Sequence, residues 1–247
     1  MWHDRKVSVV LPTYNEKDSI REAIGELWST GVVDEVIVVD NNAAPGTREQ
    51  VDGTGARLVE EKRQGYGWSC RRGLAEAVGD IVILSEPDGT FIGRDVFKLL
   101  AYSDDFDFVL GSRTAKELIW SGANMGWFLR WGNWAVAKMM EFLYNTSNLT
   151  DVGCTMRLIH RKALDEISPH FTIGRNHFSP EMMVLSILAG HKLVQIPVNY
   201  RERVGESSAT GDFWKAFKIG VAMIATILSY RFGPRRNPFA PRTPQGG

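Results

Sequence analysis

The chain has 247 residues, of which 44% are hydrophobic and 23% are charged. These proportions are ordinary for a globular protein, and the length is sufficient for a large core. The 29 basic residues equal the 29 acidic ones, which excludes a general positive field for nucleic acid and leaves phosphate binding to local clusters. Only two cysteines are present, Cys70 and Cys154, which predicts no disulfide framework and fits a reducing, cytoplasmic compartment.

Two features of the sequence bear on membrane association. Residues 1–6 are polar and no secretory signal is visible. The longest late run without a charge, residues 219–230, has 12 residues, whereas a spanning helix needs about 20. We therefore expect a chain that does not cross a membrane, although it can lie on one.

Short apolar runs alternate with helical patterns in the first half of the chain. Strands are predicted at residues 7–11, 35–39, 57–60, 81–84 and 106–110, and helices at 18–28, 69–78 and 95–102. This alternation predicts an α/β fold, with a parallel sheet that carries helices on both faces.

The second half is richer in tryptophan. Its predicted elements are a mostly helical stretch at 118–144 broken or kinked by glycines 122, 126 and 132, a loop at 151–157, a strand ending at 159, a helix at 180–188, a strand at 193–200, a polar loop at 201–208 and a helix at 213–230. Pro197 indicates that the last strand lies at a sheet edge, because proline cannot donate a ladder hydrogen bond. The proline-bearing tail, 233–247, is expected to be disordered.

An acidic turn follows the predicted strand at 81–84. Glu86 and Asp88 are spaced i, i+2, and Pro87 and Gly89 set the turn around them. Open α/β sheets bind ligands beyond the carboxyl ends of their strands, and hard cations prefer carboxylate and phosphate oxygens. We interpret the turn as a divalent-metal clamp for a diphosphate, with an ordinary acidic turn as the alternative.

Other polar groups follow neighbouring strands. Tyr14 and Glu16 come after the first strand, Asp40 after the second, and Arg113 after the strand at 106–110. Tyr14 can stack on a base, and either carboxylate can accept hydrogen bonds from a base or ribose. Each acid alone is equally typical of a helix cap. Together they predict a nucleotide crevice along one edge of the sheet.

These motifs, in their order and spacing, resemble the family 2 inverting glycosyltransferases, which have the GT-A fold. The similarity is strongest to the catalytic domain of dolichyl-phosphate mannose synthase and other polyprenyl-phosphate sugar transferases, and it covers roughly residues 7–230. The stretches that carry it are residues 10–16, 38–42, 65–67, 79–80, 86–88, 111–113, 151–153 and 201–207.

The resemblance implies roles for individual residues. It places Pro12, Tyr14, Glu16, Asp40, Asn41 and Gly67 at the nucleotide, Glu86, Asp88 and Thr90 at a bound Mg²⁺ or Mn²⁺, and Arg113, Arg130, Arg201 and Arg203 at the acceptor phosphate and leaving group. The first acid of the metal motif is Glu86 where the family has Asp. We therefore expect Asp88 to bind the metal directly and Glu86 to bind it directly or through water. The alternative for the arginines is an ordinary surface position, and the 201–208 loop is either a lid or a simple mobile loop.

The implied reaction moves a sugar, mannose from GDP-mannose as the first choice, from a nucleoside diphosphate sugar to a polyprenyl or dolichyl phosphate. Residues 1–115 would form the nucleotide-sugar half of a single domain, 1–232, and residues 116–232 the acceptor half. The alternatives are transfer from a UDP-sugar to a saccharide hydroxyl, with Asp151 as the base, or an inactive nucleotide-binding scaffold. The tryptophan-rich stretch and the last helix predict either peripheral contact with the inner face of the membrane or core packing.

Overall fold

The protein was studied as a computed structural model, in which residues 1–123, 126–205, 213–233, 235 and 237–240 are described. Three residues of the predicted 201–208 loop, Glu206, Ser207 and Ser208, lie outside these ranges. The same is true of part of the predicted tail.

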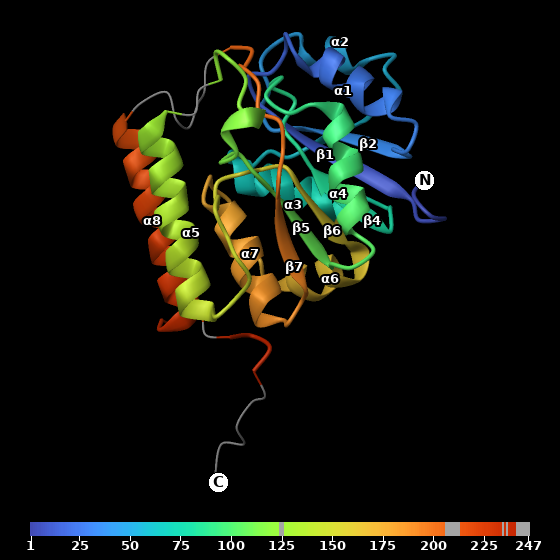
Figure 1. The fold of residues 1–247 in the computed structure, drawn as a ribbon. Coiled ribbons are helices and arrows are strands. Elements are labelled where there is room, and N and C mark those ends of the chain that lie inside the picture. The colour runs from blue at the N-terminus through green and yellow to red at the C-terminus, as the bar shows by residue number, and fades with distance from the viewer. Residues whose placement is uncertain (124–125, 206–212, 234, 236, 241–247) are drawn as a thin grey trace.

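Seven strands form a single sheet in the order β3-β2-β1-β4-β6-β5-β7 (Figure 1). The strands are β1 (Val7–Thr13), β2 (Glu35–Asp40), β3 (Arg57–Glu60), β4 (Ile81–Leu84), β5 (Phe108–Ser112), β6 (Arg157–His160) and β7 (Leu193–Pro197). Strand β6 is antiparallel to β4 and β5, and the other neighbours are parallel. The prediction of a mostly parallel sheet is confirmed, and Pro197 lies in the edge strand β7 as expected.

Helices cover both faces of the sheet, as predicted. The helices are α1 (Ile20–Ser29), α2 (Thr47–Val51), α3 (Tyr66–Glu76), α4 (Val96–Tyr102), α5 (Trp127–Tyr144), α6 (Arg161–Ile167), α7 (Phe178–Leu188) and α8 (Phe213–Arg231), with short 3₁₀ turns at η1 (Gly93–Asp95), η2 (Lys116–Leu118) and η3 (Ser168–His170). Because side chains alternate along β1, Val9 packs with α1 and α4, while Val10 packs with α3, α6 and α7. A Cβ on Gly73 would lie 2.2 Å from Val10, so this glycine lets α3 lie close to β1.

The second half differs from its prediction in one main respect. The helix expected from residue 118 begins only at Trp127, after η2 and an irregular segment. Gly126 precedes α5, and Gly132 lies inside α5 without ending it. Helices α2 and α6 were not predicted, because each is shorter than the window over which helical periodicity becomes visible.

Helices α5 and α8 lie side by side on the outer side of α7 (Figure 1). The hydroxyl of Tyr144 donates to the carbonyl of Ile227 at 2.7 Å and ties the two helices together. By length and composition alone, α8 is the one helix in the described residues that meets the requirements of a membrane span, and 22% of it is buried. The expectation that no segment qualifies is therefore corrected, because the helix extends through Lys215 and Lys218 beyond its uncharged run.

Part of the tail that we expected to be disordered contacts the domain. Phe239 stacks edge-on against His170, with 4.9 Å between the ring centroids. The guanidinium of Arg235 donates to the hydroxyl of Ser229 at 3.2 Å. The residues that follow α8 therefore contact the last turns of this helix and then the η3 turn.

Candidate active site

The acidic turn after β4 holds Asp88 in a fully buried position. One carboxylate oxygen of Asp88, Oδ1, accepts the backbone N–H of Thr90 at 2.9 Å and its hydroxyl at 2.5 Å. In the structure, Thr90 therefore orients Asp88. The contact of Thr90 with a metal, which the resemblance implied, stays a prediction. The other oxygen, Oδ2, is buried and has no hydrogen-bond partner among the described residues.

Arg203 lies over this turn and contacts two of its acids. Its Nη1 is 2.8 Å from Oδ2 of Asp88, as an ion pair without hydrogen-bond geometry, and its Nη2 donates to Oε1 of Glu16 at 2.7 Å. The N–H of Val204 donates to the carbonyl of Asp88 at 2.9 Å. Burial lowers the pKa of Arg203, but the charges of Asp88, Glu86 and Glu16 outweigh burial and raise it. The structure thus brings Arg203 to the predicted metal site.

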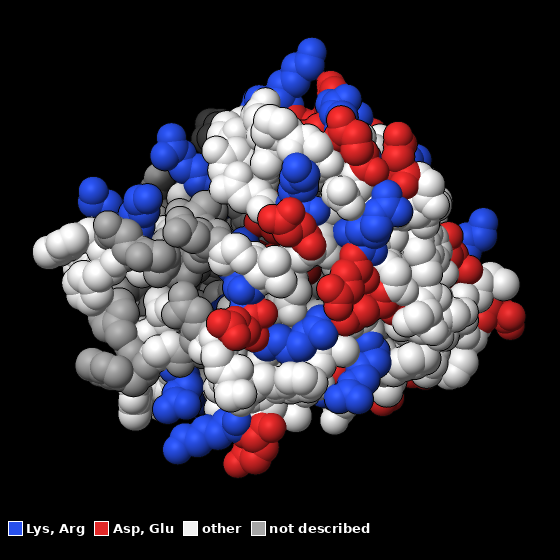
Figure 2. Space-filling model, turned by 90° about the horizontal axis from the view of Figure 1, so that it is seen from above, with Lys and Arg blue, Asp and Glu red and all other residues white. Residues whose placement is uncertain are grey.

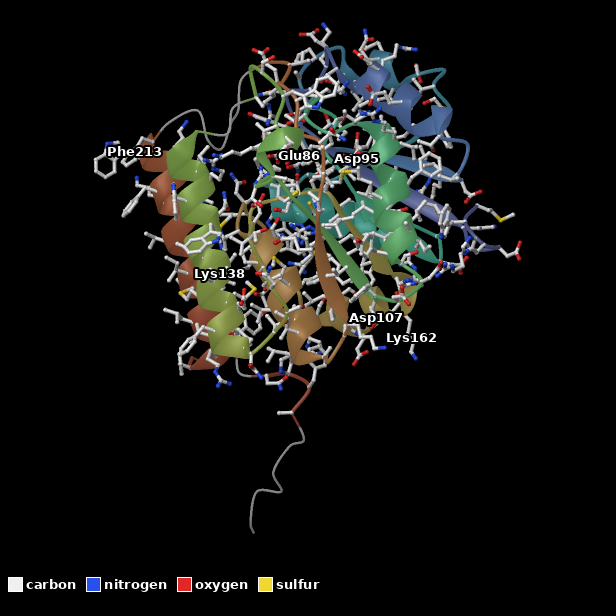
Figure 3. The ribbon with its side chains drawn as sticks, in the orientation of Figure 1. Glu86, Asp95, Asp107, Lys138, Lys162 and Phe213 are labelled. Carbon is white, nitrogen blue, oxygen red and sulfur yellow. The ribbon has the colours of Figure 1, made fainter. Side chains whose placement is uncertain are left out.

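Glu86 is half-buried and lies in the upper middle part of the view in Figure 3. Burial and the negative charges of Asp88 and Glu16 raise its pKa to about 8, although Arg203 acts in the opposite direction. Without additional positive charge, Glu86 is therefore largely protonated at neutral pH. Burial is the largest cause of this shift, and the neighbouring carboxylates add to it, so a cation bound beside Asp88 would favour the ionised form of Glu86.

The residues present suit a Mg²⁺ or Mn²⁺ ion that is coordinated by the protein on one side and by a diphosphate on the other. Oδ2 of Asp88, which has an ion-pair partner in Arg203 but no hydrogen bond among the described residues, and the adjacent Glu86 are hard oxygen donors. Across the described ranges, no group of three or more His, Cys, Asp or Glu side chains is placed to hold a metal. If a metal binds here, the described residues would supply only part of its ligands, and phosphate or water oxygens would supply the remainder, as is usual for Mg²⁺.

The acids assigned to the nucleoside are held by the protein's own groups. Oε2 of Glu16 accepts the N–H groups of Tyr14 and Asn15 at 2.7 and 2.9 Å. Asp40 accepts the N–H of Ala43 and Nε of Arg48, both at 2.8 Å. Neither acid is the N-cap of α1 or α2, so these contacts fix the turns after the strands and are not helix caps. The ring of Tyr14 is 41% exposed and is available for stacking, whereas Pro12 is buried in β1.

Asn41 and Gly67 also contact protein groups. Asn41 donates to the carbonyls of Glu61 and Arg63 at 2.7 and 2.8 Å, and it accepts the N–H of Gly65 at 2.9 Å. A Cβ on Gly67 would lie 2.7 Å from the carbonyl oxygen of Ile173. Asn41 therefore holds the turn between β3 and α3, and Gly67 lets α3 lie close to the backbone of residues 173–175. Their contact with a nucleotide stays a prediction.

Arg113 and Asp151 form the most complete ion pair of the site. The Nε and Nη2 atoms of Arg113 donate to the two oxygens of Asp151 at 2.8 and 3.0 Å. The backbone N–H groups of Arg113 and Gly153 add two further bonds, each 3.0 Å long. Burial raises the pKa of Asp151, but Arg113 outweighs burial and lowers it. This fully buried, ionised and saturated carboxylate does not suit the role of a general base.

Arg130 belongs to the same corner of the site. A Cβ on Gly153 would lie 2.4 Å from Oδ1 of Asn133 and 3.1 Å from Nη2 of Arg113, so α5 packs closely against the Arg113 turn. Arg130 precedes Asn133 by one turn on the same face of α5. In the described part of the chain Arg130 forms no ion pair, whereas Arg113 also packs on the ring of Tyr200, 5.2 Å from its centroid.

Arg201 is separated from these cations. Its guanidinium donates to the carbonyls of Gly89 and Phe91 at 3.0 and 3.1 Å and to Oε1 of Glu26 at 2.9 Å. It therefore fastens the acidic turn to α1. The sequence grouped Arg201 with Arg203, but the two side chains have different partners.

Asp95 is a structural residue of the site that the sequence did not reveal as such (Figure 3). It is fully buried and accepts the N–H and the Nδ2 of Asn199 at 2.5 and 2.8 Å. Oδ1 of Asn199 accepts Nε1 of Trp120 at 3.2 Å. Asp95 thereby fixes the start of the segment that carries Arg201 and Arg203. An aspartate at a helix start is typical of a cap, and that pattern concealed the contact.

A mostly parallel α/β sheet with a carboxylate turn beyond β4 and arginines converging on it defines a GT-A glycosyltransferase. Residues 8–168 match the family model described as glycosyl transferase family 2, and the chain belongs to that family. The fold, the enzyme class and the family that the sequence motifs indicated are thereby confirmed.

Relatives named for lipid-phosphate chemistry align over most of the chain. A dolichyl-phosphate hexose transferase of Haloferax volcanii is 28% identical over 227 residues, which are 91% of this chain and 95% of the relative. An undecaprenyl-phosphate mannosyltransferase of Micrococcus luteus is 25% identical over 225 residues, 83% of this chain and 88% of the relative.

A solved structure with the same fold is glucosyl-3-phosphoglycerate synthase from Mycobacterium tuberculosis. It superimposes with a TM-score of 0.69 at 19% identity, covering 94% of this chain and 80% of that one. It was crystallised with Mn²⁺, uridine diphosphate and phosphoglyceric acid, and in another crystal with Mg²⁺ and uridine diphosphate. At this identity the comparison establishes the fold.

Proposed function

We propose that this chain is a metal-dependent, inverting glycosyltransferase that moves mannose from GDP-mannose to a polyprenyl phosphate. The observation that carries the proposal is the buried ion pair of Arg113 and Asp151. Arg130 lies on α5 one helical turn before Asn133, whose side chain lies near Gly153 as Arg113 does. Both named lipid-phosphate relatives support this acceptor class.

The state of Asp151 favours an anionic acceptor over a hydroxyl. A hydroxyl nucleophile needs a base, and the carboxylate of Asp151 has its pKa lowered and all its oxygens bonded. A phosphate monoester is already anionic near neutral pH and needs positioning more than deprotonation. Arg113 is suited to that task, because its planar guanidinium is held in one orientation and binds phosphate oxygens in a fixed geometry.

On the donor side, a bound Mg²⁺ or Mn²⁺ would neutralise charge on the departing diphosphate. Asp88, oriented by Thr90, and the adjacent Glu86 would hold it. Arg203 already contacts Asp88, so it is placed to bind diphosphate oxygens beside the same carboxylate. The acceptor oxygen would attack the anomeric carbon from the side opposite the diphosphate, and the configuration inverts.

The test compares two acceptors of the same chain length. We expect sugar transfer from GDP-mannose to a short polyprenyl phosphate and none to the matching polyprenol, measured with Mn²⁺ near neutral pH. Arg113→Lys keeps the charge but removes the bidentate geometry, and it is expected to raise the KM for the phosphate acceptor about tenfold or more. Equal use of the alcohol would overturn the proposal.

A UDP-sugar donor is the second candidate, favoured by the uridine diphosphate in the similar structures. Calorimetric titration with GDP-mannose, UDP-glucose and the free nucleotides, each with Mn²⁺, separates the two. Failure to bind any of them, and no release of nucleotide in the presence of acceptor, would support the inactive scaffold.

We further propose that α5 and α8 lie on the cytoplasmic membrane surface, where a polyprenyl phosphate is found. These helices carry the basic residues Arg130, Lys138, Lys215, Lys218 and Arg231 against the single acid Glu141, in a chain with no net charge. In Figure 2 basic side chains are visible at the left end, which is the α5–α8 end of Figure 1. Their exposed aromatic rings include those of Trp131, Trp214 and Phe217, a combination typical of interfacial helices.

A further inference from the structure

Gln195 on β7 lies behind the Arg113–Asp151 ion pair and contacts the turn that carries Asp151. We propose that Gln195 is a positioning residue, which sets the place of Arg113 by holding the backbone of Asp151. This inference rests on the proposed role of Arg113 in binding the acceptor.

The side-chain amide of Gln195 is fully used. Its Nε2 donates to the carbonyls of Gly111 and Asp151 at 2.9 and 2.6 Å. Its Oε1 accepts the backbone N–H of Thr150 at 2.6 Å, the hydroxyl of Thr150 at 3.1 Å and the N–H of Asp151 at 3.0 Å. One side chain therefore satisfies both backbone groups of Asp151.

This arrangement replaces a missing strand pairing. The segment before β6 does not continue the sheet, so the backbone groups of residues 150 and 151 have no ladder partner in their neighbours. The primary amide of a glutamine has two N–H donors and an acceptor oxygen, so it can bond to a backbone carbonyl and a backbone N–H as a neighbouring strand would. Gln195 provides these groups from β7. A buried backbone group without such a partner destabilises the fold, because it loses its hydrogen bonds to water without replacement.

The contacts form a continuous series from β7 to the guanidinium. Gln195 fixes the backbone of Asp151, and the Asp151 carboxylate then fixes three N–H groups of Arg113. Gln195 also bonds to the carbonyl of Gly111 in β5, two residues before Arg113, which follows the end of this strand. Gln195 therefore fixes the position of the segment that carries Asp151 relative to the segment that carries Arg113.

The neighbouring residue provides a matched control. Val194 packs on the opposite face of the sheet, with the cluster that includes Val109 and Ile196. Val194→Ala perturbs packing of the same strand and leaves the Asp151 turn intact. A general loosening of β7 would act equally in both variants, whereas a positioning effect would appear only at Gln195.

The proposed test uses the full chain and the variants Gln195→Met, Arg113→Lys and their combination, with GDP-mannose and a short polyprenyl phosphate. We expect Gln195→Met to raise the acceptor KM about tenfold and to leave the calorimetric Kd of the donor within about twofold. If Gln195 acts through Arg113, its substitution has little further effect in the Arg113→Lys background. Val194→Ala should leave both constants near those of the wild type.

If Gln195→Met and Arg113→Lys raise the acceptor KM by independent, multiplicative factors, the inference is overturned. It is also overturned if Gln195→Met weakens donor binding as much as it weakens acceptor binding. If Gln195→Met does not fold, Thr150→Val removes one bond to Oε1 from the same turn and should raise the acceptor KM less, again only when Arg113 is present. No transfer and no acceptor binding by the wild type would instead refute the proposed function, which keeps the two failures distinct.

Discussion

Arg203 and Asp88 form an ion pair at the position where the sequence predicts a metal, with 2.8 Å between Nη1 and Oδ2. Asp88 is fully buried and Arg203 also contacts Glu16, so the guanidinium offsets much of the negative charge of this turn. A cation that binds here must share Asp88 with Arg203 or displace it. A metal or a diphosphate bound at this position would therefore interact with Arg203 through the carboxylate of Asp88.

The first prediction concerns the two acids of this turn. Asp88→Ala removes the buried carboxylate that pairs with Arg203 and is expected to lower transfer at least about a hundredfold and to abolish Mn²⁺-dependent donor binding. Glu86→Gln should weaken transfer much less, because Glu86 is largely protonated before a cation binds. The measurements are initial rates and calorimetric titration of the donor with and without Mn²⁺.

Asp107→Asn is the control for these variants. Asp107 precedes β5, at the end of the strand opposite Arg113, and accepts the N–H of Lys192 at 2.9 Å (Figure 3). Its substitution should leave Mn²⁺ dependence unchanged. Wild-type activity in Asp88→Ala would show that the metal site lies elsewhere.

The second prediction is a pH dependence of stability in the metal-free protein. The pKa of Glu86 is raised from 4.5 to about 8 by burial and by Asp88. The folded protein therefore holds a proton that the unfolded chain has lost, and this stabilisation is complete below pH 4.5 and is lost as the pH rises through about 8. Each unit of such a shift corresponds to about 1.4 kcal/mol.

Glu86→Gln removes this titration. In the presence of a chelator, the Tm of the wild type should fall more steeply than that of Glu86→Gln between about pH 6 and about pH 9, and the variant should be the more stable one at the upper end. Thermal unfolding at a series of pH values is the measurement. Parallel curves would mean that Glu86 ionises normally.

The local patterns of the sequence were sufficient for the sheet. The mostly apolar run of β1 and the continuous apolar run of β4 reflect burial on both faces, and Pro197 identified an edge. The direction of β6 was not predicted, because an antiparallel pairing with β4 and β5 depends on contacts distant in sequence. The late start of α5 was missed because the apolar residues from 118 onward continue a helical pattern through an irregular segment.

The site was predicted better in its chemistry than in its contacts. The sequence grouped Asp88 with Arg203 near one ligand, and the structure brings them together. It could not distinguish Arg201, whose partners are backbone carbonyls, because sequence does not show where a side chain points. For the same reason Gln195 was not singled out. Its role depends on a turn that lies 44 residues away in the chain.

The third prediction concerns the membrane surface. A Trp214→Ser, Phe217→Ser double variant on α8 should bind vesicles with anionic lipid at least about tenfold more weakly than the wild type, because these side chains are 67% and 49% exposed. Binding of the wild type should also fall in about 0.5 M salt, since the basic residues of α5 and α8 then attract the lipid less. Vesicle co-sedimentation measures both effects.

The matched control is Phe97→Ser, Tyr102→Ser on α4, where the two rings are 40% and 45% exposed. This variant should bind vesicles as the wild type does. Because α8 has the length and composition of a spanning helix, extraction of cell membranes with alkaline carbonate decides its disposition. Release of the protein would agree with a peripheral position, and retention would show that α8 crosses the bilayer.

The last prediction concerns the tail. Truncation after Phe232 removes the contact of Phe239 with His170 and the bond from Arg235 to Ser229. An edge-on aromatic pair contributes about 0.5–1.5 kcal/mol, so the truncated protein should lose stability of that order in denaturant unfolding. Its kcat and KM should stay unchanged, because these contacts lie on α8 and η3, away from Asp88 and Arg113. His170→Ala in the full chain should reproduce the loss of stability, whereas a loss of activity on truncation would give the tail a part in the reaction.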